Sequence, residues 1–126
     1  MEPELSNLDS YAEVNEITIC YRTLGNQDNP PLLLIMGLGA QLISWPQDLL
    51  QQFADEDFFV ITFDNRDCGL STHTEGEPEN SGELLVRAAT GEEVTQKYSL
   101  SNMALDSVAL LNHLGFDAAH IVGASM

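Results

Sequence analysis

Residues 120–126, His-Ile-Val-Gly-Ala-Ser-Met, form the stretch that decides how the chain is interpreted. Ile121 and Val122 continue a short apolar strand, and the four residues Gly123–Met126 match the first four positions of the five-position motif G-x-S-x-G. In that motif the chain turns sharply from a buried strand into a helix, which lifts the serine above the edge of the sheet. On these four residues alone, a serine that only caps the next helix is the better interpretation. Ser125 therefore needs support from the rest of the sequence.

Two further apolar runs, Leu32–Met36 and Phe58–Phe63, precede this stretch. Continuous rather than alternating apolarity indicates strands that are covered on both faces, as in a parallel sheet flanked by helices. With His120–Val122 they predict three buried strands. Nearer the start, Tyr11–Thr23 contains alternating apolar and polar residues, which predict two strands joined by a hairpin at Asn15-Glu16.

Helical patterns lie between the predicted strands. Ser44 is the expected N-cap of a helix over Pro46–Ala54, because a proline in the first turn costs no hydrogen bond. Apolar residues at three- and four-residue steps predict a second helix. We expect Ser99 or Ser101 to cap that helix and Leu114 to end it.

A long polar connection, Thr72–Ser99, separates the second buried strand from the second helix, and Leu84–Ala89 is a candidate short helix within it. The order strand, helix, strand, helix, strand indicates the α/β class. We expect a three-layer, doubly wound sheet that is mostly parallel, with an antiparallel N-terminal strand pair at its edge.

The charge balance excludes several classes of partner. Twenty acidic residues stand against four basic ones, for a net charge of −16, and such a field repels nucleic acids and anionic membranes. The sequence has no apolar run long enough for a transmembrane helix. Two cysteines, Cys20 and Cys68, provide neither a disulfide scaffold nor a four-cysteine zinc site. No secretory signal is visible, so we expect a cytoplasmic protein. We also expect no metal site.

Polar or glycine-rich loops follow each buried strand in a recognisable order: Gly37-Leu38-Gly39, then Asp64–Ser71, then Gly123–Met126. This order resembles the α/β-hydrolase superfamily, most of all its small-ester hydrolase, methylesterase and non-haem-peroxidase-like branch. There the three loops read H-G-x-G or a relative, D-x-R-G-x-G-x-S, and G-x-S-x-G. The resemblance covers about residues 9–126 and implies an incomplete α/β-hydrolase fold.

The resemblance implies a serine hydrolase that acts on a carboxylic ester or a similar small-molecule acyl substrate. Ser125 would be the nucleophile. The backbone N–H groups of Leu38 and Met126 would form the oxyanion hole, which stabilises the negative charge of the tetrahedral intermediate. No cofactor is expected.

Further residues would support this site. Gly37, Gly39 and Trp45 would border the substrate pocket. Asp64 and Arg66 are expected to form an ion pair that fixes their loop rather than to bind substrate.

The sequence departs from the family pattern at two positions that leave the nucleophile untouched. Met36 stands where many members have histidine, and Asp67 stands where the family often has glycine. The family's catalytic acid and histidine follow the nucleophile in chain order, so both are expected after Met126.

The histidines within the chain have simpler interpretations. His113 falls in the last turn of a predicted helix, where a cation suits the helix dipole. His120 is five residues of extended chain from Ser125, roughly 16 Å. His73 follows the second buried strand and is most simply a solvated loop residue.

These observations predict a flexible tail at residues 1–8 and the N-terminal part of an α/β-hydrolase domain at 9–126, inactive without a C-terminal part. The alternative is a small-molecule-binding member of the same fold that lacks catalysis. A nucleotide- or flavin-binding domain is disfavoured, because Gly37-Leu38-Gly39 lacks the third glycine of G-x-G-x-x-G.

Overall fold

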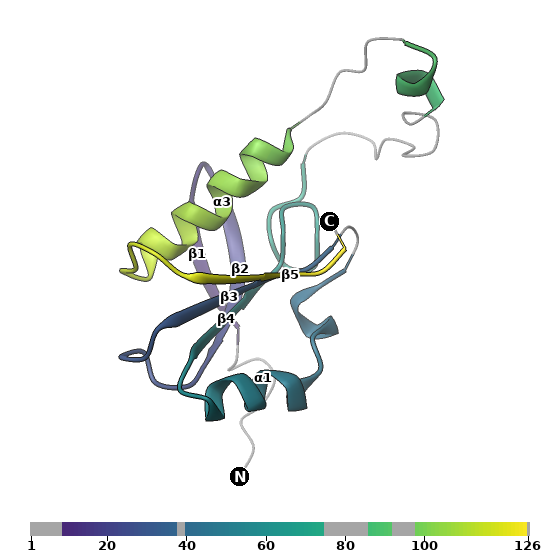
Figure 1. Cartoon of the computed structure of the whole chain (residues 1–126). Coiled ribbons are helices and arrows are strands. Elements are labelled where there is room, and N and C mark those ends of the chain that lie inside the picture. Colours follow the sequence, from purple (N-terminus) through teal and green to yellow (C-terminus); the bar gives the residue numbers. More distant parts are fainter. Residues whose placement is uncertain (1–8, 38–39, 75–85, 92–97, 126) are drawn as a thin grey trace.

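The computed structural model describes residues 9–37, 40–74, 86–91 and 98–125. Its five strands form one sheet in the order β1-β2-β4-β3-β5 (Figure 1). In chain order the elements are β1 (Ser10–Val14), β2 (Ile17–Leu24), β3 (Pro31–Ile35), the 3-10 helix η2 (Leu42–Ser44), α1 (Gln47–Asp55), β4 (Phe59–Phe63), α3 (Leu100–His113) and β5 (His120–Gly123).

Strand direction divides the sheet into two parts. β1 and β2 form an antiparallel hairpin whose turn residues, Asn15 and Glu16, have φ of 49° and 67°, as a two-residue hairpin turn requires. β2 is antiparallel to β4, whereas β4, β3 and β5 run parallel to one another. The predicted mostly parallel sheet with an antiparallel N-terminal pair is confirmed. As a result, the carboxyl ends of β3, β4 and β5 lie at the same edge of the sheet.

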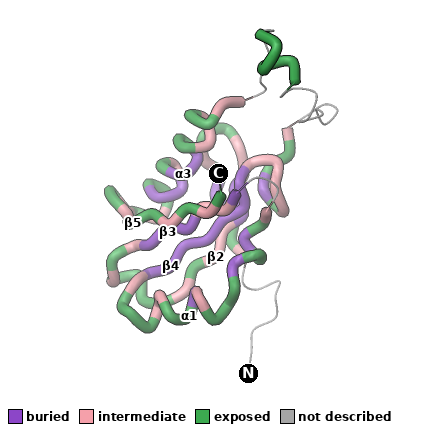
Figure 2. Tube along the Cα trace, turned by 45° about the vertical axis from the view of Figure 1, so that its right-hand side comes forward, coloured by how far each residue is buried: buried purple, intermediate pink, exposed green. Residues whose placement is uncertain are grey.

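Helices cover opposite faces of the sheet, with α3 on one side and α1 on the other (Figure 1). Successive strand residues point to opposite faces, so Leu33 and Ile61 pack in one apolar cluster with Leu110 of α3. Leu34 on the other face packs in a second cluster with Leu50 of α1. Figure 2 shows β3 and β4 buried along their length between these layers, which places the core at the centre of the sheet.

The beginning of α1 differs from the prediction. Ser44 lies in η2, and the N-cap of α1 is Pro46, which makes no side-chain capping bond. Trp45 is extended, with ψ of 126°, because a residue before proline avoids the helical region. Pro46 itself has a non-helical ψ of 129°, so the helix begins at Gln47. Of the two caps considered for α3, Ser99 is the N-cap and forms a capping box with Asn102.

The third predicted strand is present but is not buried as expected. β5 pairs with β3 on one side, and none of the described strands lies on its other side. Ile121 is paired with the fully buried Leu33, yet 55% of its surface is exposed. The prediction of burial was wrong because an apolar run reveals strand propensity but not whether a neighbour covers it.

Other predicted features are described in part. In the candidate helix at Leu84–Ala89, residues 86–89 are helical and 84–85 lie outside the described residues. The predicted tail, 1–8, also lies outside them. Neither cysteine forms a disulfide. Among the described residues no helix is long and apolar enough to cross a membrane.

Candidate active site

Three chain segments meet at the carboxyl edge of the parallel strands. β3 continues into Met36 and Gly37, β4 into Asp64 and Asn65, and β5 into Ala124 and Ser125. The last pair in the parallel register joins Ile35 to Gly123, and the Ala124 N–H then donates to the Ile35 carbonyl at 3.0 Å. The ends of β3 and β5 are thereby held side by side, so Ser125 emerges next to the loop that follows β3.

The backbone at Ser125 adopts a conformation that serine rarely takes. Its φ is 77°, in the left-handed region, and the residue is exposed. Such a conformation costs on the order of 1–3 kcal/mol in a residue with a Cβ and persists only where the surroundings impose it. A strained, exposed serine directly after a strand is the geometry that the G-x-S-x-G turn requires.

Gly37 makes the space that this serine occupies. A Cβ at position 37 would lie 2.6 Å from the Ser125 Cβ and 2.8 Å from the Ala124 carbonyl oxygen. Real Cβ atoms do not approach so closely. The two segments can therefore touch only because position 37 has no side chain. Leu38, Gly39 and Met126, three other predicted site residues, lie outside the described residues.

Asp64 anchors two loops through its carboxylate. The Leu42 N–H donates to Oδ1 at 2.7 Å, and the Leu70 N–H donates to Oδ2 at 3.0 Å. Gly69, with φ of 49°, passes so close that a Cβ there would lie 2.2 Å from Oδ2. The buried Ser71 hydroxyl completes the arrangement by donating to the Asp64 carbonyl at 2.6 Å. Asp64 thus links the segment that follows β3 to the loop that follows β4.

Asn65 makes a contact that was not predicted from the sequence. Its side-chain N–H₂ donates to the Met36 carbonyl at 3.0 Å, and the residue is buried. This bond ties the loop after β4 to the residue before Gly37. The available signal was a polar residue immediately after a buried strand, where buried amides usually have a partner.

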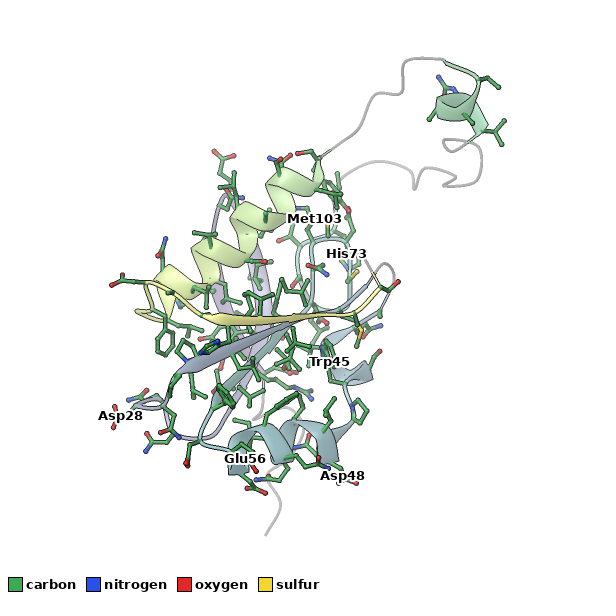
Figure 3. All side chains as sticks on the ribbon, viewed as in Figure 1. Asp28, Trp45, Asp48, Glu56, His73 and Met103 are labelled. Carbon is green, nitrogen blue, oxygen red and sulfur yellow. The ribbon has the colours of Figure 1, made fainter. Side chains whose placement is uncertain are left out.

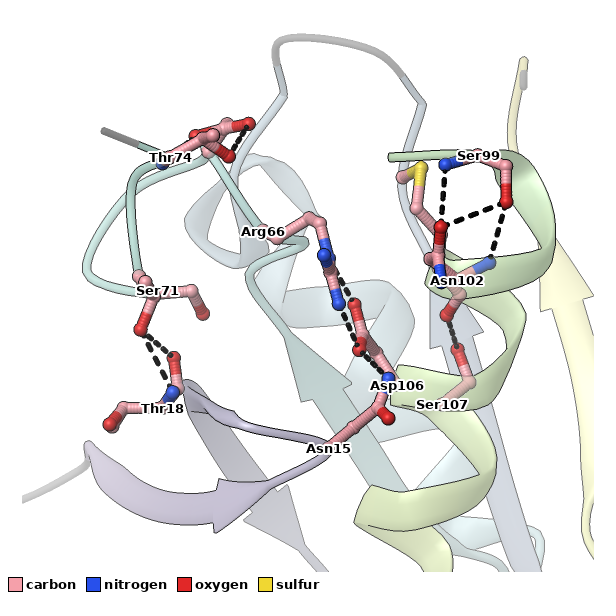
Figure 4. A network of polar contacts seen from close by, with 12 residues as sticks. Asn15, Thr18, Arg66, Ser71, Thr74, Ser99, Asn102, Asp106 and Ser107 are labelled. Carbon is pink, nitrogen blue, oxygen red and sulfur yellow. Dashed lines mark hydrogen bonds and ion pairs between the residues drawn. The ribbon is translucent and has the colours of Figure 1, made fainter. Parts of the chain in front are cut away.

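The predicted ion pair between Asp64 and Arg66 was wrong, because Arg66 turns to helix α3 instead. Its Nε and Nη2 atoms donate to the two carboxylate oxygens of Asp106, each at 2.7 Å (Figure 4). Asn15 donates to the same carboxylate at 2.7 Å. The hydrogen bonds that Arg66 donates to Asp106 raise the pKa of Arg66 above its usual value, although burial opposes the shift. The pair joins α3 to the loop after β4 and to the β1–β2 turn.

Asp67, the position at which glycine was expected, has φ of 65°. Aspartate tolerates this conformation better than most residues. Its carboxylate accepts hydrogen bonds from the Thr74 N–H, from the Thr74 hydroxyl at 2.8 Å and from the Tyr98 hydroxyl. Burial opposes ionisation of Asp67, but these hydrogen bonds outweigh it and lower its pKa. Burial and the bond to Asp67 raise the pKa of Tyr98 to about 12.

Trp45 is buried in the core on the α1 side of the sheet (Figure 3). Met36 and Ala124, the neighbours of the strand ends, pack against the same apolar cluster. Trp45 therefore packs in the cluster that also holds the residues preceding Gly37 and Ser125, and it supports the site in this way. A role at the substrate pocket stays a prediction.

The described histidines have partners other than Ser125. The ring of His113 packs on Tyr21 and that of His120 on Phe58, with centroids 6.3 and 5.7 Å apart. The exposed His73 ring is hydrogen-bonded to the Gly69 carbonyl at 2.9 Å. Cys20 is no competing nucleophile, because burial first, and then Asp9 and Asp64, raise the pKa of its thiol to about 11.

Several known proteins and solved structures are similar to this chain. A family model described as alpha/beta hydrolase fold matches residues 30–126. The chain is 29% identical over 112 residues to rhodomycin D methylesterase DauP of Streptomyces sp. strain C5, covering 89% of the chain and 32% of that protein. It is 27% identical over 111 residues to 3-oxoadipate enol-lactonase 2 of Acinetobacter baylyi, covering 88% and 33%.

Solved structures show the same fold. A hydrolase from Pseudomonas aeruginosa superposes with a TM-score of 0.72 at 24% identity, over 97% of this chain and 38% of that one. An enol-lactonase from Burkholderia xenovorans gives 0.71 at 24% identity, over 93% and 37%. The chain spans about a third of the length of the curated relatives it matches. By its family match, its sheet order and its strand-end loops, the chain belongs to the alpha/beta hydrolase fold family.

Proposed function

We propose that this chain carries the nucleophile of a serine hydrolase that acts on carboxylic esters, with Ser125 as the attacking residue. The observation that carries the proposal is the exposed serine at φ 77°, seated against a glycine that has no room for a side chain. Similarity to a methylesterase and an enol-lactonase supports a carboxylic ester or lactone as the substrate class.

In the proposed reaction the Ser125 Oγ attacks the ester carbonyl carbon and its proton passes to a histidine. Backbone N–H groups of Leu38 and Met126 hold the negative oxygen of the tetrahedral intermediate, and loss of one such donor typically costs about 10²–10³ in rate. As the intermediate collapses, the histidine gives its proton to the leaving oxygen, which departs as the alcohol, and water then hydrolyses the acyl-serine to the acid. Gly37 and Gly39 are the residues proposed to border the substrate pocket.

The histidine and the acid of this reaction are proposed to belong to a C-terminal part of a longer hydrolase, of which residues 9–126 form the N-terminal part. Within the described part of the chain, His73, His113 and His120 contact Gly69, Tyr21 and Phe58, respectively. The curated relatives are about three times as long as the matched segment. A histidine that orients and deprotonates the serine is needed because a free serine hydroxyl is a weak nucleophile.

A fluorophosphonate probe tests the proposal directly. We expect the full-length protein to form one covalent adduct, and peptide mass spectrometry to place it on Ser125. Denatured protein is the control, because labelling that survives denaturation reflects no active site. Intact protein that stays unlabelled while it still binds small esters would instead favour the non-catalytic binding member of the fold.

Replacing Gly37 by alanine is expected to slow this labelling by about 10²-fold, the loss that a displacement of about 1 Å can cause at a reacting group. The new methyl group would overlap the Ser125 Cβ and push the serine from its position. The labelling rate constant, measured with limiting probe, checks this result. Gly91→Ala is the control: a Cβ at that exposed turn position meets no atom within 4 Å, so the strain that its φ of 85° imposes on alanine stays local to residue 91. Equal rates for both variants would contradict the contact.

A further inference from the structure

A cavity of about 510 Å³ lies on the α1 face of the sheet, and its lining includes neither Ser125 nor Gly37. Its floor is formed by two paired positions of β2 and β4, Arg22 with Thr62 and Leu24 with Val60. Residues 42–47 and Leu50 of α1 form the opposite wall. The volume falls in the range of sites for small organic ligands.

The charge of the lining is opposite to that of the molecule. The chain has twenty acidic residues, yet none of them is among the described residues that line the cavity. The charged residue of the lining is Arg22, whose Nε donates to Asp9 at 2.6 Å. A guanidinium has five N–H donors, so its terminal groups retain donors beyond that contact. The cavity therefore offers a local positive group within an acidic protein.

Trp45 is also part of the cavity wall. The indole N–H of Trp45 is buried and has no hydrogen-bond acceptor among the described residues. Trp45 as a whole is 8% exposed. Because its N–H is closed off from solvent, Trp45 contributes apolar surface to the wall and no hydrogen bond to a ligand.

We propose that this cavity binds an amphipathic monocarboxylate, an alkyl or aryl chain that ends in a carboxylate. The chain would lie along Leu24, Leu50 and Val60, and Arg22 would donate to the carboxylate. Binding at this site does not depend on Ser125 or on the proposed esterase reaction.

Trp45 is the one tryptophan of the chain, so its fluorescence reports on the cavity wall. Titration of the 126-residue protein with octanoate at about 0.15 M salt, which screens the repulsion from the net charge of −16, is expected to change this emission with saturation. Octylamine and 1-octanol, which share the chain but lack the carboxylate, should bind at least about 10-fold more weakly, as expected for loss of a hydrogen bond to a charged group.

Two variants should move the affinity in opposite directions. Arg22→Gln removes the positive group and is expected to weaken octanoate binding about 10-fold. Asp9→Asn removes the competing carboxylate and is expected to tighten it. General destabilisation would weaken binding in both. Ser125→Ala should leave the affinity unchanged, which separates this site from the proposed active site.

Three results would overturn the proposal. Equal affinity for octanoate and 1-octanol would show only an apolar cleft. A similar loss of octanoate affinity in Arg22→Gln and Asp9→Asn would show that Arg22 does not bind the carboxylate. Emission from the unliganded protein like that of indole in water would show that Trp45 does not form the buried wall.

Discussion

Replacing Ser125 by alanine in the proposed full-length hydrolase is expected to lower kcat/KM for p-nitrophenyl butyrate by about 10⁴-fold or more, the scale seen when a nucleophilic serine is removed. The variant keeps the backbone and loses only the attacking oxygen. Any residual rate would come from oxyanion stabilisation and substrate binding alone. Because alanine and serine both carry a Cβ, the contact with Gly37 is unchanged. KM is expected to change far less than kcat.

Ser101 offers a matched control for that substitution. It is an exposed serine in the first turn of α3 and does not belong to the strand-end loops. Ser101→Ala should therefore hydrolyse the ester at the wild-type rate. Retention of activity by Ser125→Ala would identify a different nucleophile and remove the basis of the proposed function.

Replacing Asp106 by alanine is expected to lower the free energy of unfolding by about 3–5 kcal/mol, the usual cost of leaving one partner of a buried ion pair alone. The Asp106 side chain is 3% exposed and that of Arg66 is 14% exposed. The variant would leave the Arg66 guanidinium without its carboxylate and Asn15 without an acceptor. Urea denaturation followed by circular dichroism measures the change.

The double variant Arg66→Leu/Asp106→Leu separates the unpaired charge from the lost contact. Apolar replacement of both partners is often close to neutral, so it should recover most of the stability lost in Asp106→Ala. Asp117→Ala, at an exposed acid, should change the stability by less than about 0.5 kcal/mol. If Asp106→Ala behaves like Asp117→Ala, the pair contributes nothing to the fold.

The sheet could be predicted from the sequence because its signal is local. Continuous apolar runs such as Leu32–Met36 reveal a covered strand wherever the strand finally lies. The Asn15-Glu16 hairpin was legible for the same reason. Which strands become neighbours on both sides is not local, so the exposure of Ile121 could not be read from its own residues.

The site shows the same division. The position of Ser125 after a strand follows from chain order, and the absence of a side chain at Gly37 is known from the sequence. The partner of Arg66 could not be predicted in this way, because Asp106 lies 40 positions away on a helix that comes near only in the folded chain. The bond from Asn65 to Met36 likewise depends on two strand ends meeting in space.

The carboxylate of Asp67 has a consequence for how this protein tolerates change. It receives hydrogen bonds from both Thr74 and Tyr98. These two residues, which flank the connection between β4 and α3, are therefore held at the same side chain. A peptide inserted or deleted between those two residues need not shift β4 or α3. This is where we would graft an affinity epitope or a reporter domain, and where length variation among natural orthologues would be tolerated best.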